Sequence, residues 1–356
     1  MADIPSTDAV DAQALSGFDA IIDVRSPGEF AEDHVPGAIS LPVLSDAERA
    51  EVGTIYVQES RYTARRIGAA HVARNIAHHL ETALADKPGT FAPLVYCWRG
   101  GQRSNAMATV LTQVGWRTTV LAGGYRTYRR NVKSSLYDDE RNLKVILLDG
   151  HTGTAKTDIL GLLAARGAQT LDLEGLAEHR GSLFGGIPGR PQPSQKMFES
   201  RLLAALDRLD PALPVIVEAE SSKIGDRMVP PVLWRAMLAA PRIELHAPLS
   251  ERIGYLTRAY ADIARDRDVL DDALQRLPVH PGRKRLEDWR RMADAGALDE
   301  LAAALIELHY DPAYDRSSRK DGRRRLGTIE VETLGPSGQA AAAEAVLGLV
   351  ATAFAA

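Results

Sequence analysis

The 356-residue chain is long enough for two domains of ordinary size, and its 45% hydrophobic and 25% charged residues are typical of a globular protein. The net charge of −4 excludes a protein that is basic overall, so any contact with nucleic acid has to come from local basic patches. The single cysteine excludes an intramolecular disulfide and any zinc site built from several cysteines.

Apolar runs and helical patterns alternate along the chain. The runs, which we expect to form buried strands, lie at residues 20–24, 94–96, 119–121, 145–148, 215–217 and 243–245. Patterns typical of helices cover 64–84 and 105–114. Strands that alternate with helices predict parallel α/β sheets. From Glu251 onward the pattern is helical, and the alanine-rich residues 340–356 predict a packed C-terminal helix.

A polar, charged stretch at residues 131–142 separates two such series. It predicts an N-terminal α/β domain over residues 1–135, and a second α/β domain with a helical, basic C-terminal region over residues 136–356. The first residues lack a basic region followed by an apolar run, and no uninterrupted apolar stretch reaches about 18 residues. We therefore expect a cytoplasmic protein that does not bind a membrane.

Cys97 opens a loop between an apolar run and a helical pattern. The loop continues with Trp98, Arg99, Gly100, Gly101, Gln102 and Arg103. Backbone N–H groups at the start of a helix bind anions in such a loop, and the glycines let the backbone curl tightly. The helix terminus and the two arginines are expected to lower the pKa of the Cys97 thiol and make it a nucleophile. A buried structural cysteine is the alternative, but it leaves the arginines and glycines unexplained.

Further motifs of the first domain resemble the rhodanese family. Residues 23–30 resemble its first strand and turn, residues 34–42 its second, and residues 121–125 its closing strand and turn. The resemblance implies a rhodanese-like fold in which Cys97 is the catalytic residue and the loop after it forms an anion cradle. Asp23 and Arg25 are expected to hydrogen bond across the domain and fix these loops, rather than to take part in the chemistry.

The second domain opens with the features of a phosphate-binding P-loop. The apolar run 145–148 leads into Gly150, Thr152, Gly153, Thr154, Ala155, Lys156 and Thr157, and a helical pattern follows. In this motif backbone N–H groups surround a diphosphate, the lysine neutralises it, and the threonine hydroxyl reaches a bound Mg²⁺. Ala155 stands where a second glycine is usual. Because alanine tolerates a helical φ, we expect the loop to keep its shape, although the replacement disfavours ordinary nucleotide hydrolysis.

Two further pairs of residues are candidate ligands of an anion or of Mg²⁺. Glu218 and Glu220 follow the apolar run 215–217, where a P-loop domain holds Mg²⁺ or a water, but the start of a capped helix explains them equally well. Arg180 and Ser182 belong to a glycine-rich loop that suits either closure over an anionic ligand or a surface turn. The sequence makes no metal ligand certain.

Basic clusters with aromatic neighbours mark the C-terminal part of the chain. Arginines and lysines gather at residues 283–291 and 316–325, near Trp289, Tyr310 and Tyr314. This pattern suits an RNA backbone with unstacked bases. A solvated helix face is the ordinary explanation of such runs.

Together these features resemble the tRNA 2-selenouridine synthase family, in which a rhodanese domain precedes a P-loop domain. The resemblance extends over most of the chain and includes residues 48–56, 97–104, 150–157, 180–185, 218–221 and 309–312. It implies a transferase that geranylates the wobble 2-thiouridine of tRNA with geranyl diphosphate, and then replaces the geranylthio group with selenium from selenophosphate.

The same resemblance implies the ligands and partners. The P-loop would bind the diphosphate, and the loop after Cys97 would bind selenophosphate. A tRNA carrying wobble 2-thiouridine and a selenophosphate supplier are the implied partners. No tightly bound cofactor is expected, and Mg²⁺ is a candidate.

Other functions fit parts of the sequence. The Cys-x5-Arg spacing also serves phosphatases that form a phosphocysteine, although Trp98 and the charged loop fill space that a phosphoprotein would need. A rhodanese-type sulfurtransferase fused to a P-loop kinase would consume ATP, which Ala155 disfavours. An RNA-binding or sulfur-carrier module without turnover has no need of Lys156.

Overall fold

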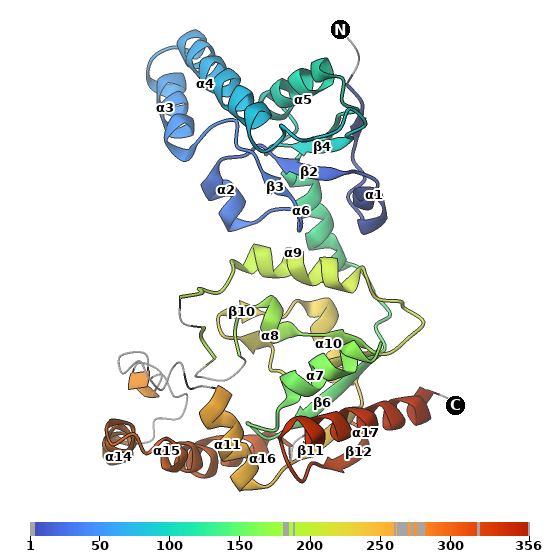
Figure 1. Ribbon diagram of the computed structural model, residues 1–356, viewed down its shortest axis with the longest axis vertical. Helices are drawn as coiled ribbons and strands as arrows, with labels where there is room; N and C mark the ends of the chain where they lie inside the picture. The colour runs from blue at the N-terminus through green and yellow to red at the C-terminus, as the bar shows by residue number, and fades with distance from the viewer. Residues whose placement is uncertain are drawn as a thin grey trace. The chain divides into compact units, whose positions relative to one another are not determined.

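The computed structural model describes residues 4–180, 185–187, 189–259, 261, 270–271, 274–275, 282–318 and 321–354. They form two compact units, each built around a five-stranded parallel sheet (Figure 1). Unit 1 consists of the described residues of Met1–Asp139 together with Ser194–Arg208, and unit 2 consists of those of Glu140–Pro193 and Leu209–Ala356. The predicted class, two α/β domains with parallel sheets, is confirmed.

The sheet of unit 1 has the strand order β1-β5-β4-β2-β3. Its strands are β1 (Ser6–Thr7), β2 (Ala20–Asp23), β3 (Ile39–Ser40), β4 (Pro93–Tyr96) and β5 (Thr119–Leu121). Every residue of the central strand β4 is buried, as expected for a parallel sheet whose two faces are covered. The apolar runs at residues 20–24, 94–96 and 119–121 are therefore confirmed as strands.

Among the helices of unit 1, α4 (Arg61–Glu81) and α5 (Gln102–Val114) contribute side chains to the core on this sheet. The described helices of unit 1 are α1 (Ala12–Ser16), α2 (Pro27–Glu32), α3 (Asp46–Gln58), α4, α5, α6 (Tyr125–Lys133), the π-helix η1 (Ser134–Asp138) and α9 (Gln195–Leu206). Helix α3 begins with a capping box, in which the Ser45 hydroxyl accepts from the backbone N–H of Glu48 and the Glu48 carboxylate accepts from that of Ser45. Met107 and Leu111 of α5 are fully buried, which anchors the helix that follows the cysteine loop.

The sheet of unit 2 has the strand order β12-β11-β6-β8-β7. Its strands are β6 (Val145–Gly150), β7 (Gln169–Leu171), β8 (Val215–Glu218), β11 (Arg242–His246) and β12 (Arg325–Glu330), and a separate short hairpin joins β9 (Lys223–Ile224) and β10 (Arg227–Met228). All six residues of β6 are buried, and the two neighbours of β6 run parallel to it. The carboxyl end of β6, where the phosphate loop begins, therefore lies at the middle of one sheet edge.

The described helices of unit 2 pack partly on this sheet and partly on one another, since α14 (Arg283–Asp294) and α15 (Leu298–Leu305) share a separate core. The helices of this unit are α7 (Lys156–Ala165), α8 (Leu173–Leu176), α10 (Pro231–Ala239), α11 (Leu249–Ala259), α14, α15, the π-helix η2 (Ile306–Tyr310), α16 (Asp311–Ser318) and α17 (Pro336–Phe354). Helices α7 and α17 lie beside each other (Figure 1) and share a core in which Ile159, Leu163 and Val346 are fully buried.

The C-terminal part differs from its sequence pattern at one strand. We expected helix throughout the region after Glu251, but residues Arg325–Glu330 form β12, which pairs in parallel with β11. The strand is short and lies at the sheet edge, with only Ile329 buried, so its apolar alternation is faint in the sequence. The helical prediction is wrong there.

The C-terminal helix is present as expected. Among the described residues, α17 is the one helix whose length and composition would allow it to cross a membrane. Ala342, Ala343 and Val346 on one face of α17 are buried in the core of unit 2. This packing is the role that the sequence predicts for the helix.

Helix α9 joins a unit that its place in the chain does not suggest. It lies within the predicted second domain, residues 136–356, yet its contacts place it in unit 1 beside α6 and η1. The Arg129 guanidinium of α6 forms an ion pair with Glu199 of α9, and Tyr137 of η1 donates to the other Glu199 oxygen at 2.7 Å. A local sequence pattern holds no information about which core such a helix joins.

Candidate functional site

The Cys97 loop connects the end of β4 to the start of α5. Cys97 is only 3% exposed, and its Sγ lies 3.3 Å from the Ser104 hydroxyl. The backbone N–H of Gly101 donates to the same sulfur at 3.3 Å. The sulfur therefore occupies the position of an anion at the start of the helix, surrounded by donors.

This environment favours the thiolate. Burial acts to raise the pKa of the Cys97 thiol, but the Ser104 hydroxyl and the backbone N–H groups of Arg99, Ser104 and Gly101 outweigh it, so the pKa lies below its ordinary value. The predicted direction is confirmed. Ser104, the strongest of these donors, was not predicted from the sequence; it is the third residue of α5.

The two arginines of the loop have different surroundings. Arg99 is exposed. The Arg103 guanidinium is held by Glu29, with 2.7 Å between Nη1 and Oε2, and Arg49 approaches the same carboxylate. Burial opposes ionisation of Glu29, yet these arginines hold the pKa of its carboxyl below the usual range. We expected Arg103 to stabilise the Cys97 thiolate. Its guanidinium instead forms an ion pair with Glu29, so it is not a dedicated partner of the thiolate.

Two glycines with positive φ let the loop pack against the turn that follows β5. A Cβ on Gly100, at φ +66°, would lie 2.7 Å from the carbonyl oxygen of Leu121. A Cβ on Gly124, at φ +58°, would lie 2.2 Å from the carbonyl oxygen of Cys97. The backbone N–H of Tyr125 donates to that same oxygen at 2.8 Å. The close approach that fixes Cys97 therefore requires glycine at both places.

Asp23 and Arg25 have the structural role predicted for them. Both are almost fully buried, and the Arg25 Nη2 donates to Asp23 Oδ2 at 2.7 Å and to the carbonyl oxygen of Asp33 at 2.5 Å. The Arg25 guanidinium also lies 4.0 Å from the centre of the Tyr125 ring. These contacts hold the residues after β2 against Tyr125, whose backbone N–H donates to the Cys97 carbonyl oxygen.

The role of Ser104 can be tested through the reactivity of Cys97. Without its hydroxyl, the Ser104→Ala variant loses a donor to the thiolate, so the pKa of Cys97 should rise and alkylation by iodoacetamide at neutral pH should slow several-fold. The pH midpoint of the alkylation rate should move upward. Thr109→Ala is a matched control, because Thr109 is also on α5 and its hydroxyl bonds only to the Asn105 carbonyl. An unchanged midpoint in Ser104→Ala would contradict this explanation.

The phosphate loop lies at the carboxyl end of β6 and continues into α7. The Lys156 ammonium donates to the carbonyl oxygens of Gly150 at 2.9 Å and His151 at 3.3 Å, so it lies within the loop. Thr157 is exposed, and its hydroxyl lies 3.3 Å from a carboxylate oxygen of Glu174. The strand, loop and helix expected of a P-loop are all present.

Ala155 adopts a conformation that we did not expect. Its φ is +56° and its ψ is 32°, in the left-handed region, where a residue other than glycine is strained by about 1–2 kcal/mol. We expected the loop to keep its shape because alanine tolerates a helical φ, and the structure instead gives Ala155 a left-handed φ. Its side chain is 2% exposed and packs in the core with Ile159 and Leu160, so burial of the methyl group offsets part of the strain. The loop keeps its shape because the surrounding core holds it.

Three carboxylates gather beside the phosphate loop. Oxygens of Glu174, Glu218 and Glu220 all lie within 4.8 Å of one another. Burial, together with the negative charges of Glu218 and Glu220, raises the pKa of Glu174 well above its ordinary value. Burial also raises the pKa of Glu218, with the Lys156 ammonium opposing it and Glu220 adding to it.

This cluster answers the question that Glu218 and Glu220 left open. No helix starts there, because the hairpin of β9 and β10 follows β8, and the two side chains converge with Glu174 next to Thr157. Glu218 is 1% exposed, and its Oε1 has no hydrogen-bond partner among the described residues. The sequence analysis missed Glu174, three residues after β7, where only its position past the end of a strand could have indicated it.

A cavity of about 590 Å³, which we call the diphosphate pocket, covers the phosphate loop. One wall is the loop from Gly150 to Thr157 with the three glutamates. The facing wall is largely apolar and comes from α11, η2 and α16: Tyr255, Leu256, Ala259, His309, Tyr310, Ala313 and Tyr314. The pocket thus joins a polar floor, formed by the phosphate loop and the glutamates, to an apolar wall.

The second predicted loop is only partly described. Arg180 lines the diphosphate pocket, and its Nη1 donates to the carbonyl oxygen of Ala259 at 3.2 Å. Ser182, its predicted companion, lies outside the described residues. Arg180 therefore lies beside the candidate anion site, and the role of Ser182 stays a prediction.

The basic clusters are less free than the sequence suggested. We considered Trp289 as a surface on which RNA bases could stack. It is only 1% exposed, in a core with Leu301 and Leu305, so it cannot have that role. Arg319 and Lys320 lie outside the described residues. Many of the other arginines form ion pairs. Arg283 pairs with Glu287, Arg291 with Asp288 and Arg323 with Asp321 inside the clusters, and Arg290 pairs with Asp271 and Arg325 with Glu244 outside them.

The fold and the two sites define a class of protein: a rhodanese-like domain with a cysteine in an anion-binding loop, joined to a P-loop domain. The family model of the rhodanese-like domain matches residues 7–131. The model described as the tRNA 2-selenouridine synthase AAA domain matches residues 143–277.

Relatives align along most of the chain. The tRNA 2-selenouridine synthase of Hahella chejuensis (strain KCTC 2396) is 35% identical over 322 residues, which cover 85% of this chain and 81% of that protein. Proteins of the same name from Sulfurovum sp. (strain NBC37-1) and Marinobacter nauticus (strain ATCC 700491 / DSM 11845 / VT8) are 30% and 33% identical, and 90% and 87% of their lengths are covered. The chain belongs to the tRNA 2-selenouridine synthase family.

Proposed function

We propose that this protein geranylates the 2-thiouridine at the wobble position of tRNA, using geranyl diphosphate, and then replaces the geranylthio group with selenium from selenophosphate. The diphosphate pocket is the observation that carries the proposal. A ligand made of a diphosphate and a hydrocarbon chain is complementary to a phosphate loop that faces an apolar wall. Membership of a family whose relatives are named for selenouridine in tRNA supports the acceptor and the second step.

The first reaction is a substitution at the C1 carbon of the geranyl group. The sulfur of the thiouridine forms a bond to C1, the bond from C1 to the diphosphate oxygen breaks, and the N3 proton of the base is released. The Lys156 ammonium and the loop N–H groups stabilise the negative charge that develops on the departing diphosphate. No γ-phosphate is transferred, so the strained Ala155 need not satisfy the geometry of nucleotide hydrolysis.

Mg²⁺ fits the three carboxylates as a partner of the diphosphate. Hard cations prefer oxygen ligands, and Glu218 has a buried oxygen without a hydrogen-bond partner among the described residues. Glu174, Glu218 and Glu220 would hold the ion beside Thr157. When bound, it would neutralise diphosphate charge.

The second reaction takes place at Cys97 in this proposal. Selenophosphate is an anion, and the loop after Cys97 offers helix N–H groups and the exposed Arg99. Overall, the bond from C2 of the base to sulfur is replaced by a bond to selenium, water cleaves the selenium–phosphorus bond, and geranyl thiol and phosphate leave. The lowered pKa of Cys97 supports its role as the nucleophile. Its thiolate would form a bond to C2 of the base as geranyl thiol leaves, and the selenium of selenophosphate would then form its bond to C2 as the Cys97 thiolate leaves.

Mass spectrometry of tRNA nucleosides tests the proposal. The protein is incubated with thiolated tRNA and geranyl diphosphate, with and without selenophosphate. We expect a geranylated nucleoside without selenophosphate and a selenated nucleoside when selenophosphate is present. Absence of both products would overturn the proposal, and product formation that depends on ATP would favour the kinase alternative.

The apolar wall predicts how the geranyl chain is held. Tyr255→Ala should raise the Kd for geranyl diphosphate about tenfold, because burial of a large side chain against a ligand stabilises it by roughly 1.5–3 kcal/mol. Competition by inorganic diphosphate should be unchanged, because that ligand has no hydrocarbon. Isothermal titration with both ligands makes the comparison, and Ile253→Ala, on the same helix but outside the pocket lining, is the control. Equal weakening for both ligands would contradict the assignment of the wall.

Removal of divalent cations tests the carboxylate cluster. Dialysis against EDTA should stop geranyl transfer, and added Mg²⁺ should restore it. Glu174→Gln should raise the Mg²⁺ concentration needed for half-maximal rate, because it removes one charged ligand from the cluster. Glu140→Gln changes an exposed glutamate of unit 2 away from the cluster and is the control. Transfer that persists in EDTA would show that the glutamates act without a metal.

A further inference from the structure

A second cavity adjoins the diphosphate pocket within unit 2. We call it the side pocket; it measures about 820 Å³ and has no role in the function described so far. Asp149, Ala219, Glu220 and Tyr314 line both cavities. A ligand in the side pocket would therefore reach the edge of the diphosphate pocket, close to the phosphate loop.

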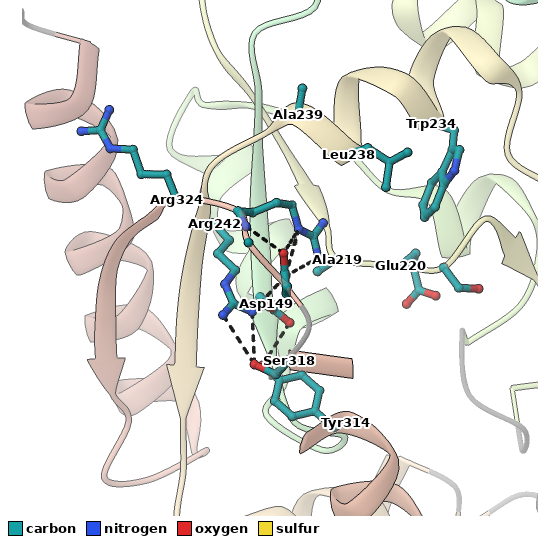
Figure 2. Close-up of a pocket in the computed structure, with 14 residues that line it drawn as sticks. Asp149, Ala219, Glu220, Trp234, Leu238, Ala239, Arg242, Tyr314, Ser318 and Arg324 are labelled. Carbon is teal, nitrogen blue, oxygen red and sulfur yellow. Dashed lines mark hydrogen bonds and ion pairs between the residues drawn. The ribbon is translucent and has the colours of Figure 1, made fainter. Parts of the chain in front are cut away.

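The two sides of the side pocket differ in chemistry. Trp234 and Leu238 lie one helical turn apart on α10 and form an apolar side, and Asp149 and Arg242 lie across from them (Figure 2). Leu238 is 54% exposed, although the neighbouring Leu233 on the same helix is fully buried. Helix α10 thus turns a partly exposed indole and an exposed leucine toward open space.

The opposite side is a fixed set of donors and acceptors. Arg242 lies 2.8 Å from Asp149 and 3.2 Å from Asp321, and Arg323 forms a forked pair with Asp321 at 2.7 to 2.9 Å. Arg242 is 4% exposed, and its Nε has no hydrogen-bond partner among the described residues. A ligand with polar edges can use these groups, whereas a hydrocarbon cannot.

Tyr314 marks the boundary between the cavities. Its hydroxyl lies 3.2 Å from Asp149 and 3.4 Å from Glu244, and its ring packs 4.1 Å from that of His151 in the phosphate loop. Tyr314 is therefore fixed from both directions. A planar ligand in the side pocket would have one edge near this boundary and one face along α10.

We propose that the side pocket binds the thiouracil base of the acceptor nucleotide, stacked on Trp234. This inference rests on the proposed function, in which sulfur attacks a carbon attached to the diphosphate. The base has an aromatic face for the indole and hydrogen-bonding edges for the charged side, and RNA-binding proteins commonly hold unstacked bases in this way. The geranyl chain already has an apolar wall in the diphosphate pocket, so the mixed chemistry of the side pocket favours the base.

The test compares two anticodon stem-loop RNAs, one with 2-thiouridine at the wobble position and one with an abasic site there. We expect the protein to bind the first about tenfold more tightly in fluorescence anisotropy, because each stacked base contributes to that extent. In Trp234→Ala the two RNAs should bind alike, and in Trp234→Phe most of the preference should return because a ring is retained. The Kd for geranyl diphosphate should be the same in all three proteins.

A second pair of variants separates the pocket from general surface effects. Leu238→Ala should reduce the preference for the thiouridine RNA, and Leu213→Ala should not. Both leucines belong to unit 2 and are about half exposed, at 54% and 52%, but only Leu238 lines the side pocket. Retention of the full preference in Trp234→Ala would overturn the proposal. A defect of Trp234→Ala in geranyl diphosphate binding alone would also overturn it, by assigning the pocket to the hydrocarbon.

These binding measurements need no geranyl transfer. If the wild-type protein forms no geranylated nucleoside, the proposed function fails, while the RNA comparison still reports on the side pocket. If transfer occurs but the base preference does not depend on Trp234, only the present inference fails.

Discussion

Lys156→Ala should reduce the rate of geranyl transfer by about 10²–10³-fold, because it removes a positive charge from the site where the leaving diphosphate gains charge. Lys156 contacts the carbonyl oxygens of Gly150 and His151 at the centre of the loop. Initial rates measured by mass spectrometry of the geranylated nucleoside give the comparison.

Lys144→Ala is a matched control for this experiment. Lys144 precedes β6, at the opposite end from the phosphate loop, and its ammonium also donates to a backbone carbonyl, that of Ala212, at 2.7 Å. Its loss should leave the rate unchanged. Geranyl transfer that survives in Lys156→Ala would contradict the assignment of the loop to the diphosphate.

Cys97→Ala should abolish selenation and leave geranylation at least partly active. The thiolate that would attack C2 of the base is lost, whereas the phosphate loop and its apolar wall belong to unit 2 and are untouched. The two steps can be measured separately, with thiolated RNA for the first and previously geranylated RNA for the second.

Both possible failures of this prediction are informative. Selenation that persists in Cys97→Ala would show that the cysteine is not the nucleophile. Loss of both steps in a variant that still folds, as judged by circular dichroism, would show that the two chemistries cannot be separated between the units. Geranylation thus serves as the internal control for the cysteine substitution.

The sequence was sufficient for the strands and loops that carry the chemistry. Buried parallel strands are short continuous apolar runs, and the structure confirms all six that were predicted. The cysteine loop and the phosphate loop each follow such a run, so local sequence determines where Cys97 and Lys156 lie. Edge strands are harder, and β12 was missed because Ile329 is its one buried residue.

Features that depend on distant contacts could not be predicted. Glu174 joins Glu218 only because β7 and β8 are neighbours in the sheet, and Arg103 meets Glu29 from 74 positions away. Arg290 and Arg325 looked unopposed because their acidic partners, Asp271 and Glu244, lie outside the basic clusters. The left-handed φ of Ala155 follows from the shape of the loop and overrides the preference of the residue.

The path of the chain through α9 limits how this protein can be divided. Unit 1 includes Ser194–Arg208, which lie between the two stretches of sequence that form unit 2. Neither unit is therefore one continuous stretch of the chain. A fragment ending at Asp139 would leave Arg129 and Tyr137 without Glu199. A fragment beginning at Glu140 would carry α9 without the helices it packs on. Gene fusion or exchange of one half between relatives would therefore separate residues that fold together, and the two halves are expected to change in evolution as a pair.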